Sequence, residues 1–279
     1  DRKAAKEIAR QIDKETAIGN FRGPLHGVPM TVKESFNLSG APTTWGDPKN
    51  IHNIATTDSD AVARLRSAGA IVFGKTNVPL DLVEWQTFNK IYGTTNNPWD
   101  QTRTPGGSSG GSAAALSTGM SALEIGSDAG SSIRNPAHYW GIFGMKPTFK
   151  VVSSQGQCIE ETHSESDISV VGPLARTAED LKLAFEAIRG LRAIESTAFK
   201  NNLPADDRTK LSQFRIGLKL NDPESPVDND YLDKLEKFVM SLENAGAKII
   251  RNKLPDIDNE LHFMIYLKLV GASDSPHFT

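Results

Sequence analysis

The sequence predicts an α/β fold. Three observations support this class: an amphipathic helical stripe over residues 3–16, and two separate stretches with the strand–helix–strand pattern of a βαβ unit. Hydrophobic residues make up 38% of the 279, which is enough for a sizeable core. We expect one domain over residues 1–279, because a single α/β core of this size is more economical than two.

The first βαβ unit follows from local patterns. Residues 28–33 and 70–74 are short apolar runs typical of strands. Residues 58–68 between them have a helix pattern, with Ser59 or Asp58 as the N-cap. We expect the crossover between the two strands to be right-handed, as nearly all such connections are.

The second half of the chain repeats this logic. Thr177 is a suitable cap for a helix that continues to residue 188. Strands are predicted at residues 214–218 and 247–250, with a helix at 228–245 between them. Residues 198–211 are polar and predict a connection in which an insertion or mobile loop could lie.

Composition excludes several classes of function. The net charge is −3 without a basic cluster, so we expect no direct contact with nucleic acid. Cys158 is the only cysteine, which rules out an intramolecular disulfide and favours the reducing cytoplasm; we interpret it as a loop residue without a catalytic part. The apolar run at residues 261–270 is too short for a membrane span and contains Lys268.

Two Gly/Ser-rich loops within residues 105–148 are the strongest functional signal. Residues 106–111 fit the spacing of a P-loop, but the lysine that should follow is absent. The G-x-S-x-G pattern is centred on both Ser108 and Ser109, yet a turn sequence precedes it instead of a strand. Because no histidine stands in a diagnostic context, these residues favour a serine nucleophile with a different base.

Four segments then carry a resemblance. Gly-Gly-Ser-Ser-Gly-Gly-Ser at 106–112, Gly-Ser-Asp-Ala-Gly-Ser-Ser-Ile-Arg at 126–134, Gly-Met-Lys-Pro-Thr at 144–148 and Gly-Val-Pro-Met-Thr-Val-Lys-Glu at 27–34 resemble the amidase signature family of serine hydrolases. The match runs from about residue 23 to 176 and is far more specific than a lone glycine motif. The resemblance implies the family fold, a mixed β-sheet core sandwiched between helices, and this agrees with the pattern of strands and helices above.

The resemblance implies a Ser-Ser-Lys triad of Lys33, Ser108 and Ser132, with no cofactor and no metal. Ser132 would be the nucleophile, Lys33 the base, and Ser108 the relay between them, following a cis peptide bond as in the family. Lys33 can act as a base only when neutral, so its pKa must fall from about 10.4 through burial or neighbouring positive charge. We expect Ser132 Oγ to lie within hydrogen-bond reach of Ser108, and Ser108 within reach of Lys33.

The second loop also predicts an oxyanion site. If a helix begins at Ser132, the N–H groups of Ala129, Gly130, Ser131 and Ser132 converge there as free donors. The family usually has glycine where this chain has Ser131. We expect a negative φ at Ser131, because a hydrolase should not keep a strained donor without compensation.

Supporting roles are assigned to residues near these loops. Asp128 and Arg134 flank the nucleophile with opposite charge, which predicts an ion pair that pins the loop. Lys75 also follows an apolar strand and is the rival base, although we interpret it as a residue that supports a loop. Trp85, Trp99 and Trp140 are expected in the core or at its rim and not in a cofactor box, and the resemblance would allow some of them to line an acyl pocket.

We therefore expect an amidase that cleaves a small-molecule carboxamide to a carboxylate and ammonia or an amine. Two alternatives stay open: the A subunit of a glutamine-dependent tRNA amidotransferase, and a nucleotide- or phosphate-binding module. Residues 166–169, Ser-Asp-Ile-Ser, depart from the Ser-Leu-Asp-Gln that is usual in that amidotransferase. A homo-oligomer also stays open.

The chain is expected to be a fragment. It begins at Asp1, and family members continue well beyond residue 279. The part expected after residue 279 would complete the sheet and the substrate pocket, so we expect residues 261–270 to form an apolar helix without its partner.

Overall fold

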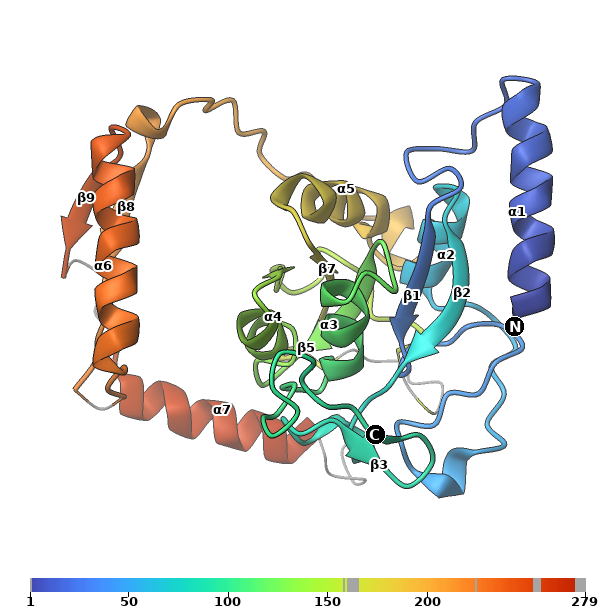
Figure 1. Ribbon diagram of the computed structural model, residues 1–279, viewed down its shortest axis with the longest axis horizontal. Coiled ribbons are helices and arrows are strands. Elements are labelled where there is room, and N and C mark those ends of the chain that lie inside the picture. The colour runs from blue at the N-terminus through green and yellow to red at the C-terminus, as the bar shows by residue number, and fades with distance from the viewer. Residues whose placement is uncertain (1, 158, 160–165, 224, 253–256, 274–279) are drawn as a thin grey trace. The chain divides into compact units, whose positions relative to one another are not determined.

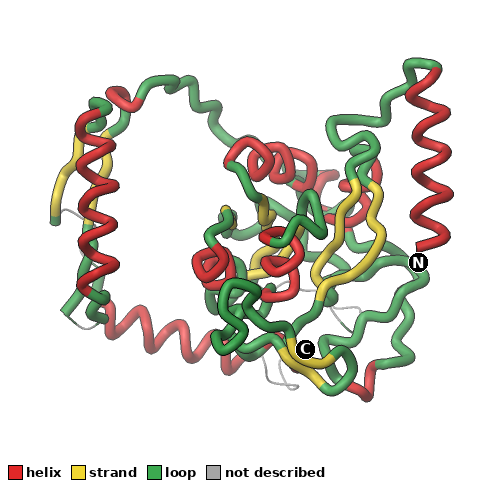
Figure 2. Tube along the Cα trace, in the orientation of Figure 1, coloured by secondary structure: helices red, strands yellow, loops and turns green. Residues whose placement is uncertain are grey.

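The computed structural model describes the chain except for a few short stretches (Figures 1 and 2). The described residues are 2–157, 159, 166–223, 225–252 and 257–273. Cys158, expected in a loop, lies outside them. The chain divides into two compact units, Asp1–Asn201 and Asn202–Ser275. This division concerns contacts within the chain and does not test the expected single domain over residues 1–279, which stays a prediction.

The first predicted βαβ unit is confirmed. Strand β1 (Pro29–Lys33) lies parallel to β2 (Ile71–Thr76), and helix α2 (Asp60–Ser67) connects them. Ser59 is the N-cap of α2, because its side chain accepts a hydrogen bond from the Val62 N–H. Met30 and Val32 of β1 and Ala61, Val62 and Leu65 of α2 are buried in one hydrophobic core.

The predicted opening helix is also present, as α1 (Arg2–Ala17). Of its predicted apolar stripe, only Ile12 is buried. Helix α5 (Ala178–Ile188) begins after Thr177, whose hydroxyl accepts from the Asp180 N–H, as predicted. Its inner face joins the core that β1 and α2 share.

The two Gly/Ser loops lie around a second, antiparallel sheet. Strand β7 (Val170–Ala175) pairs with β5 (Glu124–Asp128) on one side and with β6 (Phe143–Gly144) on the other. Helix α3 (Gly110–Ser117) follows the first loop, and α4 (Arg134–Trp140) follows the second. The helix expected to begin at Ser132 thus begins two residues later.

The strands form several small sheets instead of one continuous ladder. Strands β1 and β5 lie side by side, but they are joined by contacts such as Ala122 N–H to Pro29 O (3.3 Å) and Thr31 N–H to Ser121 Oγ (2.9 Å). The remaining elements of the first unit are short: η1 (Pro48–Asn50), η2 (Leu80–Leu82), β3 (Phe88–Asn89), β4 (Gly93–Thr94) and η3 (Glu195–Thr197).

The second unit confirms the second predicted βαβ pattern. Strand β8 (Arg215–Leu218) lies parallel to β9 (Lys248–Arg251), with α6 (Asn229–Asn244) between them in the chain. The short η4 (Leu211–Gln213) precedes β8, and α7 (Asn259–Ser273) ends the described chain. Apolar side chains of α7 are exposed, as expected for its sequence. Within the described residues, no helix is long and apolar enough to cross a membrane.

Candidate active site

Lys33 is the centre of the candidate site. It ends β1 and is fully buried, with 0% of its surface exposed. Its Nζ donates to Ser108 Oγ at 2.7 Å and to Ser127 Oγ at 2.9 Å. The lysine and the relay serine named from the sequence are therefore in direct contact, and Ser127 is an additional partner.

The environment of Lys33 lowers the pKa of its amine. Burial lowers the pKa of Lys33 from 10.5 to about 7, while the negative charge of Asp128 opposes this shift. No acidic side chain is hydrogen-bonded to the amine among the described residues; its two partners are hydroxyls. A neutral lysine in this position can accept a proton from a hydroxyl.

The loop that carries Ser108 is held by close backbone packing. The Gly107–Ser108 peptide bond is cis, as the resemblance implied. A β-carbon at Gly107 would lie 2.5 Å from the Glu84 carbonyl oxygen and 3.1 Å from Trp85 Cα, so only glycine fits there. Trp140 is buried in α4 and donates its indole N–H to the carbonyl before this loop, that of Pro105, at 2.5 Å.

Ser132 lies next to this loop through its backbone. The Ser109 N–H donates to the Ser132 carbonyl at 3.2 Å. The Ser132 hydroxyl has no hydrogen bond to any described residue, so the expected contact with Ser108 is not formed as a hydrogen bond here. The residue is 8% exposed.

Asp128 organises the second loop. One carboxylate oxygen, Oδ1, accepts from the Ser131 N–H (3.0 Å), and Oδ2 accepts from the N–H groups of Ile133 (3.0 Å) and Arg134 (3.2 Å). The Arg134 guanidinium adds two bonds, from Nε at 3.0 Å and Nη2 at 2.8 Å. Burial raises the pKa of Asp128, but these hydrogen bonds outweigh burial and lower it overall.

Ser131 corrects two expectations. Its φ is +74°, in the left-handed region, whereas we expected a negative φ. Its N–H is bound to Asp128, so it is not a free oxyanion donor. The N–H groups of Gly130 and Ser132 donate to no described residue and remain candidates, together with that of Ala129, which follows β5.

Sequence reasoning missed Glu124, a fully buried acid on β5. Its Oε1 accepts a hydrogen bond from the Thr31 hydroxyl of β1, and its Oε2 is buried without a partner. Burial raises the pKa of Glu124 from 4.5 to about 8, although the Thr31 and Ser112 hydroxyls oppose the shift. The raised pKa favours the uncharged carboxyl, which connects the strand of Lys33 to the strand before Ser132.

Lys75, the rival base, lies away from the serines. Its Nζ donates to the Pro42 carbonyl (2.5 Å) and to Thr43 Oγ1 (3.1 Å), and it lies 3.9 Å from the Glu34 carboxylate. Burial lowers the pKa of Lys75 to about 8, and Glu34 opposes the shift. These contacts tie it to the loop after β1, as expected for a supporting residue.

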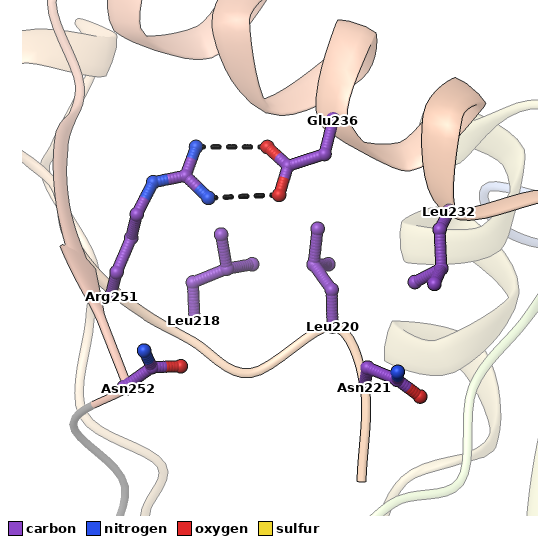
Figure 3. Close-up of a pocket in the computed structure, with 7 residues that line it drawn as sticks. All are labelled: Leu218, Leu220, Asn221, Leu232, Glu236, Arg251 and Asn252. Carbon is purple, nitrogen blue, oxygen red and sulfur yellow. Dashed lines mark hydrogen bonds and ion pairs between the residues drawn. The ribbon is translucent and has the colours of Figure 1, made fainter. Parts of the chain in front are cut away.

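A hollow of about 390 Å³ lies in the second unit (Figure 3). Leu218 of β8 and Leu220, which follows that strand, lie beneath an ion pair in which Arg251 and Glu236 make two parallel hydrogen bonds of 2.9 Å each. The Glu236 carboxylate is taken up by Arg251, and no serine, cysteine, lysine or histidine is among the residues that line the hollow. None of the site residues expected from the sequence lines this hollow. Nor do the described residues contain a group of three side chains that could hold a metal ion.

Comparison with known proteins gives consistent matches. The family model described as Amidase matches residues 1–276. The A subunit of glutamyl-tRNA(Gln) amidotransferase from Trichodesmium erythraeum is 39% identical over 249 residues, covering 86% of this chain and 50% of that protein. The chain thus spans about half the length of the curated relatives it matches.

Solved structures agree with this result. A fatty acid amide hydrolase superposes with a TM-score of 0.82 at 30% identity, covering 96% of this chain and 48% of that one. The peptide amidase of Stenotrophomonas maltophilia superposes with a TM-score of 0.75 at 28% identity, covering 90% and 53%. These likenesses confirm the predicted α/β fold.

Proposed function

The chain belongs to the Amidase family, and we propose that it hydrolyses a carboxamide with Ser132 as nucleophile, Ser108 as relay and Lys33 as base. The observation that carries the proposal is the 2.7 Å contact between Lys33 Nζ and Ser108 Oγ in a fully buried setting. A lysine buried between two hydroxyls has lost much of its affinity for a proton, which is what a base at neutral pH requires.

In the acylation step, Ser132 Oγ bonds to the amide carbon and the carbon–nitrogen bond breaks. The proton of Ser132 passes to Ser108, whose own proton passes to Lys33; the reverse transfer delivers a proton to the leaving nitrogen. The route requires Ser132 and Ser108 to come into hydrogen-bond contact when substrate binds. Catalytic contacts are often longer without substrate and tighten in the complex.

In the deacylation step, water attacks the acyl-enzyme, and the same relay removes a proton from the water and returns one to Ser132. Negative charge develops on the carbonyl oxygen in both steps. We assign its stabilisation to the backbone N–H groups of Gly130 and Ser132, with Ala129 as a further donor. Asp128 keeps this segment in place through five hydrogen bonds.

For the substrate, the relatives favour glutamine. Curated relatives that cover most of this chain are named as the A subunit of glutamyl-tRNA(Gln) amidotransferase. We therefore propose that the protein releases ammonia from the glutamine side chain and works with other subunits, which would hold the tRNA. A stand-alone amidase is the second candidate, because a fatty acid amide hydrolase superposes closely and residues 166–169 lack the sequence usual in the amidotransferase.

Ammonia release separates these candidates. The purified protein is assayed with glutamine, butyramide, benzamide and oleamide, with Ser132→Ala as the control. We expect glutamine to be the preferred substrate and Ser132→Ala to be inactive. Hydrolysis of the other amides but not of glutamine would favour the stand-alone amidase. Saturable binding of ATP with Mg²⁺, without amide hydrolysis, would favour a phosphate-binding module instead.

A further inference from the structure

The side chain of Trp85 reaches the nucleophile loop from another part of the chain. It lies between η2 and β3, and its indole Nε1–H donates to the Gly130 carbonyl at 3.0 Å. The residue is 53% exposed, so burial does little to fix its ring. Its main chain is nevertheless fixed, because Gly107 packs against Trp85 Cα with no room for a side chain. Trp85 thus touches both serine loops.

The Gly130 carbonyl oxygen, which accepts from Trp85, belongs to the same peptide unit as the Ser131 N–H. A trans peptide is planar, and its C=O and N–H point in opposite directions. Trp85 binds the oxygen of this unit, and Asp128 Oδ1 binds its N–H, each at 3.0 Å. The two bonds act from opposite edges and fix the rotation of the plane, which in turn sets φ at Ser131.

The φ angle of Ser131 lies in a region that is unfavourable for serine. Ser131 has φ +74°, where a residue with a β-carbon is disfavoured roughly tenfold relative to the right-handed region. Rotation of the Gly130–Ser131 peptide would relieve this strain, and it would also turn the neighbouring N–H groups away from their present directions. Glycine at this position would not favour rotation, because glycine populates both signs of φ.

We infer that Trp85 is a positioning residue, whose indole N–H keeps the Gly130–Ser131 peptide in its catalytic orientation and offsets the strain that Ser131 introduces. The inference rests on the proposed role of Ser132, because the held segment leads directly into that nucleophile. Trp85 acts through the loop and needs no contact with the reacting atoms. Its importance is tied to the serine at position 131.

A double-mutant cycle with a fluorophosphonate probe tests this coupling. Trp85→Phe keeps an aromatic ring and removes the N–H, and Ser131→Gly removes the strain. We expect Trp85→Phe to lower the maximal labelling rate roughly fivefold in the Ser131 protein, with little change in the concentration for half-maximal rate. In the Ser131→Gly protein, Trp85→Phe should lower the maximal labelling rate by less than about twofold. Tyr231→Phe, at an exposed tyrosine of α6 that has no part in the proposed site, is the control for loss of a polar hydrogen from an aromatic side chain and should have no effect.

The folding equilibrium gives a readout that does not depend on catalysis. Ser131→Gly should raise the urea midpoint of unfolding more in the protein with Trp85 than in Trp85→Phe, where the loop has already relaxed. The inference would be overturned if Trp85→Phe lowered the labelling rate equally in the Ser131 and Ser131→Gly proteins, or did not lower it in either. If the probe fails to label Ser132 in the unmodified protein, the proposed function fails, and the urea cycle alone decides the role of Trp85.

Discussion

Replacing Lys33 with methionine should stabilise the protein while removing its activity. Burial lowers the Lys33 pKa from 10.5 to about 7, which at about 1.4 kcal/mol per pKa unit corresponds to roughly 5 kcal/mol of unfolding free energy at neutral pH. Methionine fills a similar volume without a titrating group. It leaves Ser108 and Ser127 without their donor, which costs about 1 kcal/mol each. The expected net gain is therefore about 3 kcal/mol.

The pH dependence has a definite sign. Above pH 10.5 the lysine is neutral in both the folded and the unfolded chain, so its titration has no effect on stability. As pH falls from 10.5 to 7, only the unfolded chain takes up the proton, and the folded state loses about 1.4 kcal/mol per pH unit. The advantage of Lys33→Met should therefore be largest at and below pH 7 and should shrink towards pH 10.

Urea unfolding of both proteins between pH 6 and 10 at constant ionic strength measures this difference. Lys182→Met, at an exposed lysine of α5, is the matched control for the loss of a lysine and should change the unfolding free energy little. If Lys33→Met is less stable at pH 7, or its advantage is the same at pH 7 and pH 10, the folded protein keeps Lys33 charged. The assignment of Lys33 as the base would then be refuted.

Three further results follow from the same geometry. Ser131→Gly should raise the unfolding free energy by up to about 1 kcal/mol without lowering kcat, because glycine adopts the positive φ freely; a lower urea midpoint would contradict this. Between pH 4.5 and 8 only the unfolded chain ionises Glu124, so the unfolding free energy of the unmodified protein should fall by about 1.4 kcal/mol per pH unit as pH rises. Glu124→Gln should lack this loss, and parallel stability curves for the two proteins would disprove it. Asp128→Asn removes the charge that raises the Lys33 pKa, so the acidic limb of kcat/KM, expected near pH 7 in the unmodified protein, should move to lower pH. The maximal kcat/KM should also fall, and an upward shift of the limb in a pH–rate series would count against the prediction.

The fold was largely predictable because its signals are local. The alternation of apolar runs with a capped helix predicted β1, α2 and β2, and Ser59 proved to be the cap. The division of the strands into small sheets was not predictable, because it depends on how β1 meets β5 in three dimensions.

The candidate site divides in the same way. The motif placed Lys33 and Ser108 correctly relative to each other, since the strand and the loop each have a clear pattern. The positive φ of Ser131 was missed because its peptide is held by side chains from elsewhere, those of Asp128 and Trp85. A buried Glu124 could not be recognised either, because acidic residues are ordinarily exposed.

Identification of the residue that becomes covalently modified tests the central claim most directly. The protein is treated with a fluorophosphonate probe at pH 8, digested, and mapped by tandem mass spectrometry. We predict that the phosphonyl group is attached to Ser132, that Ser132→Ala abolishes labelling, and that Ser108→Ala slows it strongly without moving it. Labelling of Ser108 itself, or labelling that persists in Ser132→Ala, would contradict the proposed mechanism.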